Sequence, residues 1–463
     1  MKRFLSLSRK RGWGEVVLLR AAILLFGFVA ASAQQATNTP ANAVFATNPP
    51  ARLSLADARR IALERNWDLL AAKSGIDAAQ AQLIVAREFP NPTASLSTAN
   101  IGDRESATLM GNGLWERNYD SIAAINQLIE IGGKRRSRQT SARAGIMGAR
   151  ARFFDAKRSL EQGVTKAYMA AVLAGQNAGI LNESAGYLLH EAEIAEARLK
   201  AGDISDSDKN QIEINAEQFE LQAKAAEAAA VQARIAVEIL LGERQPRGNW
   251  TPTESLDQLV NASPPPAIEG ASNAGRPDVL AAEADLRKSN ADLKLQKAMR
   301  IPDPTVSIQG EHNPPGGGYP PEGGPTVDTV GVGVSFPLPL WNRNRGNIKA
   351  AEAAREQAVI ALEKAKAQVI SDIANAEVAY REAFERWQKY RDQTGPKAAK
   401  VRESVAYAYE KGGAALVELL EAERTANDVE LATAQAMADT ANAAADLVAA
   451  RSELSERELT SQK

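Results

Sequence analysis

An internal repeat constrains the fold of this chain more than any other feature of its sequence. The tetrapeptide Phe89-Pro90-Asn91-Pro92 recurs as Ile301-Pro302-Asp303-Pro304, 212 residues later, each time where an Ala-rich helical pattern stops. Residues 131–136 correspond to residues 340–345 at an offset of 209, and Gly202 corresponds to Gly412 at an offset of 210. We therefore expect two halves with one order of parts: helix, strand, loop, strand, long helix, turn, helix.

The predicted long helices exceed those of an ordinary globular domain. Residues 134–200 contain no Pro, and a helix of that length would span about 100 Å. The second half repeats the pattern over residues 347–411, with an interruption expected near Gly395-Pro396. Small residues at the spacing of a coiled-coil seam, such as Ala351, Ala354 and Ala358, would let helices approach closely. Shorter helices are predicted at residues 54–88, 203–241, 276–300 and 413–454, so that two of them can stack end to end beside each long helix.

Alternating residues predict strands between the helices. Residues 329–336 place one set of side chains on an apolar face that suits lipid and leave Gly331, Gly333 and Ser335 for a lumen. In the first half, Ile122, Ala124 and Leu128 are expected to form a similar apolar face, and residues 93–99 and 305–309 are the partner strands. A breaker-rich loop, residues 314–321, joins the second pair. The residues predicted to face lipid are Val330, Val332, Val334 and Phe336.

Four strands cannot close a barrel through a membrane, because single-chain barrels need about 8 or more strands and an open edge in lipid leaves backbone groups unpaired. The chain must therefore oligomerise if its strands span a bilayer. No segment after the first 33 residues is apolar for long enough to span as a helix.

The first 33 residues predict a cleaved secretory signal peptide. Basic residues precede an apolar run over residues 21–30, and Ala31-Ser32-Ala33 is a cleavage site of the small-residue type. An uncleaved anchor helix is the alternative, but Glu15 and Arg20 shorten the apolar stretch. The predicted organisation is a signal peptide at 1–33, a linker at 34–53, a first repeat at 54–241, a Pro-rich equatorial segment at 242–275 lying as a belt outside the helices, a second repeat at 276–458 and a tail at 459–463.

Composition argues against several classes of function. Lys+Arg 55 against Asp+Glu 57 gives no field of one sign, so nucleic acid is not an expected partner. The absence of Cys excludes disulfides, thiolate metal sites and a lipid-anchored N-terminal Cys. His190-Glu191 begins a zinc motif whose second ligand is missing, since residue 194 is Ile. We expect no catalytic residue, no metal site and no cofactor.

These residues together resemble the TolC-like outer-membrane factors, the OEP family. The resemblance covers nearly all of the mature chain and rests on the duplicated halves, the basic turns after each strand pair and the Gly turns at the far end. Residues 336–348 look most like the CzcC and CnrC branch, which serves heavy-metal pumps of the resistance-nodulation-division (RND) class. The resemblance implies a mainly α fold with a membrane β part: a homotrimer in the outer membrane, whose 12-stranded β-barrel is continued by a long periplasmic α-helical barrel, with a periplasmic adaptor and an inner-membrane RND pump as partners.

The resemblance also implies two functional regions at the periplasmic end. The tip turns would contact the adaptor, although simple helix caps would also explain the Gly residues. Glu418 and Glu421 match the acidic positions where the family narrows its tunnel, and a trimer would place six carboxylates around that opening. The alternative is solvated acids favoured by the helix dipole, the reading we prefer for Asp203, Asp206 and Asp208. The residues implied at the tips are Arg198, Gly202, Asp203, Ser205, Gly412, Gly413 and Ala414.

The basic residues that open the long helices, such as Lys134 and Arg135, could meet lipid phosphates, but snorkelling at the interface explains them as well. The function expected is an outer-membrane duct that passively conducts substrate, above all heavy-metal cations, for a tripartite RND-type pump. Organic toxins or type I secretion are alternative cargoes, since a passive tunnel needs no ligand set. A periplasmic coiled-coil structural protein is the alternative of another class.

Overall fold

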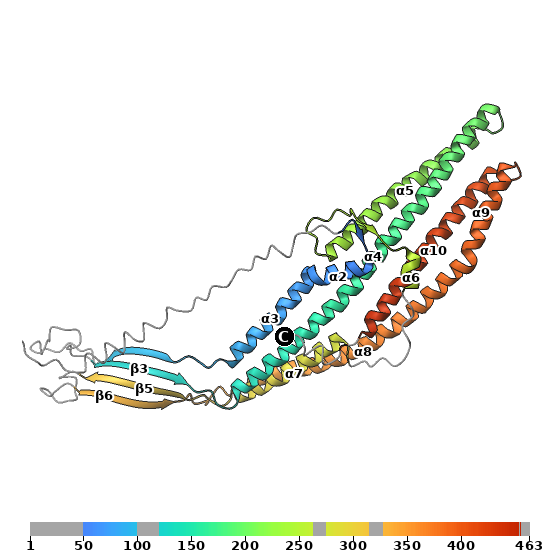
Figure 1. Ribbon diagram of the computed structural model, residues 1–463. Coiled ribbons are helices and arrows are strands. Elements are labelled where there is room, and N and C mark those ends of the chain that lie inside the picture. The colour runs from blue at the N-terminus through green and yellow to red at the C-terminus, as the bar shows by residue number, and fades with distance from the viewer. Residues whose placement is uncertain (1–49, 100–119, 263–274, 314–326, 453, 455–463) are drawn as a thin grey trace, which may run out of the picture. The chain divides into compact units, whose positions relative to one another are not determined.

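Figure 1 shows the computed structural model, which describes residues 50–99, 120–262, 275–313, 327–452 and 454. The predicted signal peptide at 1–33, most of the linker, the loop at 314–321 and the tail at 459–463 lie outside the described residues. The described part is mainly α-helical, with a four-stranded sheet and a smaller two-stranded one.

The first half follows the predicted order. It contains α2 (Leu55–Arg65), α3 (Trp67–Arg87), β2 (Thr93–Ala99), β3 (Asp120–Leu128), α4 (Lys134–Ala201) and α5 (Asp206–Leu240). The single helix predicted at 54–88 is wrong, because the chain leaves helical geometry at Asn66. The Asn66 amide oxygen accepts a hydrogen bond from the Leu69 N–H at 3.0 Å, and its amide nitrogen donates to the Leu240 carbonyl at 3.0 Å. Asn66 therefore caps α3 and ties the break to the end of α5.

The second half repeats this order. It contains α7 (Pro277–Ala298), β5 (Thr305–Asn313), β6 (Val327–Ser335), α8 (Arg345–Lys389), a π-helical turn η4 (Tyr390–Thr394), α9 (Gly395–Glu410) and α10 (Leu416–Arg451). The turn η4 lies where Gly395-Pro396 predicts an interruption, since Pro396 lacks the N–H that a regular helix needs.

The helices pack as two short ones beside each long one. Along α4, α3 and α5 follow one another, and α7 packs on the same helix near the strands (Figure 1). In the second half α7 and α10 both pack against α8, and α10 also contacts α9 and α4. The stacking expected from helix lengths is therefore present in both halves. Within the described residues, none of the helices combines the length and hydropathy needed to cross a membrane.

Side-chain parity divides the four-stranded sheet into two faces. The strands are antiparallel neighbours in the order β2-β3-β5-β6. Val330, Val332 and Val334 lie opposite Gly310, Ile308 and Val306 of β5. The three valines are 82%, 76% and 63% exposed, so this face is uncovered in a single chain. The same face continues into β3 and β2 through Ala123, Ile125, Leu96 and Ala94.

The apolar face predicted for the first half is wrong. Ile122 lies opposite Glu311 and Ala124 opposite Gln309, which places both on the face of Gly331 and Ser335. Leu128, opposite Thr305, lies there too. The short apolar set in β3 gave no strict alternation, and the register with β5 decided the face instead.

Phe336 is not part of a strand, contrary to the prediction. β6 ends at Ser335, which pairs with Thr305, so Phe336 would face Pro304. The Pro304 carbonyl bonds to Ile129 on the β3 side, and Pro337, the next residue whose amide would point at β5, has no N–H, so regular pairing with β5 cannot continue. Phe336 is nevertheless 58% exposed, as the three valines before it are largely exposed.

Two short strands and a short helix form a buried junction with the long helix α4. Strand β1 (Arg52–Leu53) pairs in parallel with β4 (Thr251–Pro252), and α6 (Leu256–Asn261) follows. Trp250 stacks on Tyr168 of α4 with ring centroids 5.8 Å apart, and both are almost fully buried. Burial and the nearby Glu254 carboxylate raise the pKa of Tyr168. The described part of the equatorial segment is thus packed onto the helices.

Candidate functional site

The first tip turn joins α4 to α5. Gly202 follows α4 with φ of 83°, in the left-handed region, and the Asp203 N–H donates to the Arg198 carbonyl at 2.9 Å. Ser205 then caps α5, since its hydroxyl accepts from the Asp208 N–H at 3.1 Å. The Asp208 carboxylate accepts in return from the Ser205 N–H at 3.4 Å. Asp208 is therefore a capping residue, as the dipole reading of these acids predicts.

The second tip turn has the same backbone design. Gly412 has φ of 74°, and the Gly413 N–H donates to the Ala408 carbonyl at 2.7 Å, as Asp203 does to Arg198. Both turns are Schellman motifs, which need a residue that tolerates left-handed geometry. Ala414 is half-buried beside the turn. All seven predicted tip residues thus lie in or beside two matching turns.

The structure brings these two turns together. The Arg198 guanidinium lies over the Tyr409 ring, 5.4 Å from its centroid. Beneath them, Ala195, Ile212 and Leu416 form a small buried cluster from α4, α5 and α10. A cation over an aromatic ring contributes about 0.5–1 kcal/mol at an exposed site. The tips therefore form one composite surface rather than two separate turns.

Glu418 and Glu421 lie in the first turns of α10, on its exposed side. Leu416 and Leu419 of the same turns are buried, so the two carboxylates point away from the packed face. The Glu418 carboxylate accepts from the Ala415 N–H at 3.2 Å, and Ala415 itself has no side-chain acceptor. Glu418 therefore has a capping role, whereas no such bond engages Glu421 among the hydrogen bonds of the described residues.

Sequence reasoning missed a polar cluster further along α10. Glu423 and Asn427 are 4% and 2% exposed, and Asn427 accepts a hydrogen bond from the Ser184 hydroxyl of α4. Burial raises the pKa of Glu423, partly opposed by Arg402 of α9, and burial raises the pKa of Tyr187 to about 12. The signal was available, since Glu423 occupies an apolar position of the α10 stripe between Leu419 and Ala426.

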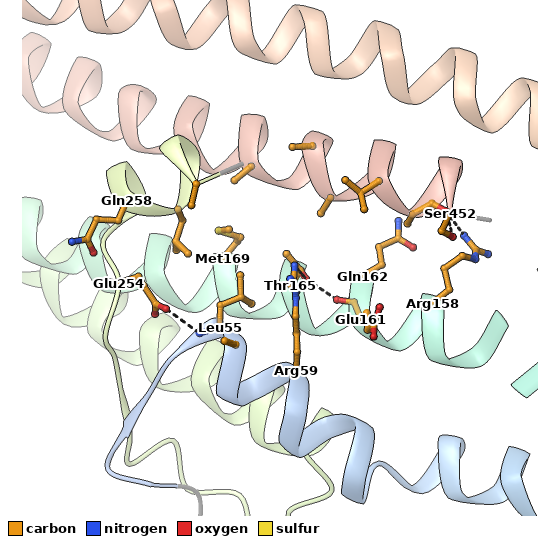
Figure 2. Close-up of a pocket in the computed structure, with 18 residues that line it drawn as sticks. Leu55, Arg59, Arg158, Glu161, Gln162, Thr165, Met169, Glu254, Gln258 and Ser452 are labelled. Atoms are coloured by element: carbon orange, nitrogen blue, oxygen red, sulfur yellow. Dashed lines mark hydrogen bonds between the residues drawn. The ribbon is translucent and has the colours of Figure 1, made fainter. Parts of the chain in front are cut away.

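A groove lies between α2, α4, α6 and α10 (Figure 2). Arg59 donates to the Thr165 hydroxyl oxygen at 2.9 and 3.1 Å, and Arg158 donates to the Ala449 carbonyl at 3.2 Å. Its volume is about 810 Å³. None of the site residues expected from the sequence lines it, and several of its polar side chains already have hydrogen-bond partners in the chain. Among the described residues, His, Asp and Glu form no group of three able to hold a metal ion.

Comparison with known proteins identifies the family. The sequence profile described as "Outer membrane efflux protein" matches residues 58–243 and 271–451, which together make up most of the chain and fall on its two halves. The chain belongs to this family. It is thus an outer-membrane efflux protein, with its helices as a long periplasmic extension, and the resemblance seen in the sequence is confirmed.

Individual relatives agree with this assignment. The cobalt-zinc-cadmium resistance protein CzcC of Cupriavidus metallidurans is 26% identical over 321 residues, which cover 69% of this efflux protein and 71% of CzcC. A membrane protein from Pseudomonas aeruginosa matches with a TM-score of 0.68 and 21% identity, over 86% of this chain and 90% of that one. The CmeC outer membrane channel of Campylobacter jejuni matches with a TM-score of 0.67 and 18% identity, over 86% and 85%. These two structures confirm the fold.

Proposed function

We propose that three copies of this protein form a duct that carries substrate passively out of the cell. The observation that carries the proposal is the sheet order β2-β3-β5-β6, which leaves β2 and β6 as the outer strands of each chain. Open edges are not tolerated in lipid, so an outer-membrane sheet of this kind calls for other copies. Three chains would close a 12-stranded β-barrel, and their long helices would continue the passage into the periplasm.

The energy for export would come from partners. A periplasmic adaptor would contact the composite surface at the tips, where Arg198 and Tyr409 meet, and an RND pump in the inner membrane would drive the cargo. The repeated Schellman turns support this proposal, because each presents the end of a helical hairpin in the same way.

The cargo we propose is heavy-metal cations. The relative CzcC, a cobalt-zinc-cadmium resistance protein, supports this choice, as do the two exposed carboxylates at the start of α10. Rings of carboxylates favour cations in channels. The passage itself needs no metal-ligand set, so the absence of a cluster of ligands among the described residues does not bear on the cargo.

A deletion strain tests the proposal. Loss of the gene should raise sensitivity to cobalt, zinc or cadmium, and the restored gene should reverse it. If the deletion strain becomes sensitive to organic toxins alone, the cargo is organic and not a metal cation, and the proposal of a duct still stands. Unboiled gels of outer-membrane fractions test the duct itself: a heat-modifiable trimer is expected, whereas a periplasmic monomer would support the coiled-coil structural alternative.

A further inference from the structure

The two halves of the chain are already joined by one strand seam. β3 of the first half pairs with β5 of the second, with Leu128 opposite Thr305. The ladder continues past both strands, since the Ile129 N–H donates to the Pro304 carbonyl at 2.9 Å. In this internal seam, the end of β3 pairs with the Pro-bounded segment that precedes β5.

Among the described residues, the corresponding parts at the outer strands have no such partner. Leu96 of β2 is 79% exposed, and Val334 of β6 is 63% exposed. Just beyond β6, Phe336 and Leu338 are 58% and 64% exposed. In the drawing β2 and β6 lie on opposite edges of the sheet (Figure 1). These apolar side chains are therefore available to another copy.

The repeat gives a register for that contact. Thr93 faces Asn126 in the first half, and Thr305 faces Ser335 in the second. The first strand of each pair is thus offset by 212 residues and the second by 209. Applied to the internal seam, where Leu128 faces Thr305, these offsets place residue 337 of one copy opposite residue 93 of the next.

We propose that β6 of one copy pairs with β2 of the next copy in this register, with Ser335 opposite Ser95 and Val334 opposite Leu96. The proposal rests on the trimer of the proposed function and goes beyond it by fixing the seam between chains. In this register the chain's own β3–β5 junction is the template for all the seams between copies.

Side-chain parity is consistent with the register. Val334 and Leu96 both lie on the apolar face of the sheet, and Ser335 and Ser95 both lie on the other face. A slip of one residue would place Val334 beside a polar neighbour and break the apolar face at the seam. Phe336 would lie opposite Ala94, so a large side chain meets a small one. A shift of two residues would keep the same faces together, so the repeat rather than parity fixes the register.

Backbone chemistry supports it as well. In the internal seam the Ile129 N–H points at its partner strand, and the equivalent residue at the outer seam is Leu338. Leu338 would donate to the carbonyl of Pro92, which corresponds to Pro304. Pro337, which has no N–H, then falls at a position whose amide would point away from the seam. The sequence thus places Pro where the seam needs no donor.

Cysteine cross-linking tests the register, because the natural chain contains no Cys. Ser95→Cys with Ser335→Cys places two thiols directly opposite each other across the seam, within the distance a disulfide needs. Within one chain the two strands are three strand spacings apart, about 14 Å, which is too far for a disulfide. The matched control is Ser97→Cys with Ser335→Cys, which is two residues out of register on the same face.

After mild oxidation of whole outer membranes, the Ser95/Ser335 pair should lose its monomer band to covalent trimers on boiled, non-reducing gels, and the Ser97/Ser335 pair should not. Two results would overturn the register but keep the trimer. In the first, the Ser95/Ser335 variant runs as a trimer on unboiled gels but forms no cross-link; in the second, the Ser97/Ser335 control forms the stronger cross-link. If neither variant nor the natural chain runs as a trimer, the proposed function itself fails.

Discussion

The Lys134 ammonium group lies 2.7 Å from the Asp303 carboxylate, so that an ion pair ties the first residue of α4 to the Pro-bounded corner before β5. Lys134 also donates to the Ile301 carbonyl at 2.5 Å, and Asp303 accepts from the Ile131 N–H at 2.9 Å. The two charged side chains are only 7% and 16% exposed. The halves of the chain are thus locked together where sheet gives way to helix.

Replacement of Lys134 by Met should destabilise this junction. It leaves the Asp303 carboxylate buried without its cation, a change that typically costs about 3–5 kcal/mol. Trimers of Lys134→Met should therefore dissociate at a lower temperature on unboiled gels. Arg136→Met is the control, because Arg136 is exposed and should leave that temperature unchanged. Adding Asp303→Asn to Lys134→Met should recover part of the loss, since the amide oxygen can still accept from Ile131. A loss in Arg136→Met as large as that in Lys134→Met would contradict the ion-pair account.

Glu423 should make stability depend on pH. Burial raises the pKa of its carboxyl, while Arg402 lowers it, and Arg402 is itself paired with Glu430 at 3.2 Å. A raised folded-state pKa means that the folded chain favours the protonated form. Its stabilising contribution is complete below the ordinary pKa of Glu and is lost as pH rises through the folded-state pKa.

Glu423→Gln should therefore raise the dissociation temperature of the trimer at about pH 8 and have a smaller effect at about pH 5. Glu191 and Glu430, which also influence the Glu423 carboxyl, remain in both proteins. Glu403→Gln is the matched control. Glu403 and Glu423 line one cavity between α4, α9 and α10, but Glu403 is exposed. An increase of the same size at both pH values would rule out titration of Glu423 as its cause.

Two glycines, one inside α4 and one directly after it, should respond in opposite ways to Ala. Gly202 has φ of 83°, where an added Cβ costs roughly 1–2 kcal/mol, although no atom lies within 4 Å of it. Gly186 is helical and equally open, so Ala there should stabilise the helix by roughly 0.5–1 kcal/mol. Thermal unfolding followed by circular dichroism should show a lower midpoint for Gly202→Ala and a higher one for Gly186→Ala. The same sign for both would refute the role assigned to the turn.

Much of the fold could be predicted because the repeat and the helix lengths act over long stretches of sequence. β2 was predicted at its observed bounds, and α4 differs from the prediction by one residue at its end. Long Pro-free segments and turns with Gly are strong local signals. The order of the parts in each half followed from them.

The errors fall where a partner strand or a single side chain decides the local structure. Asn66 breaks the first helix through a hydrogen bond to Leu240, 174 residues away, which no local pattern reports. The face of Ile122 depends on the register with β5, and Phe336 lies outside β6 because Pro337 after it has no N–H to pair with β5. The buried position of Glu423 follows from α10 packing against α4, so the polar cluster could be found only as a charge on an apolar stripe.

Substitutions that keep the cap but remove charge can separate the two roles of the acids on α10. Glu418→Gln retains an acceptor for the Ala415 N–H, and Glu421→Gln touches no cap, so the double variant should fold normally. If six carboxylates surround the opening of the trimer, the double variant removes all six charges. It should then lower cation selectivity several-fold in planar bilayers. Asp206→Asn, an exposed acid in the first turn of α5, is the control and should leave selectivity unchanged. Unaltered selectivity in the double variant would leave Glu418 with its capping role alone and remove the acidic ring from the mechanism.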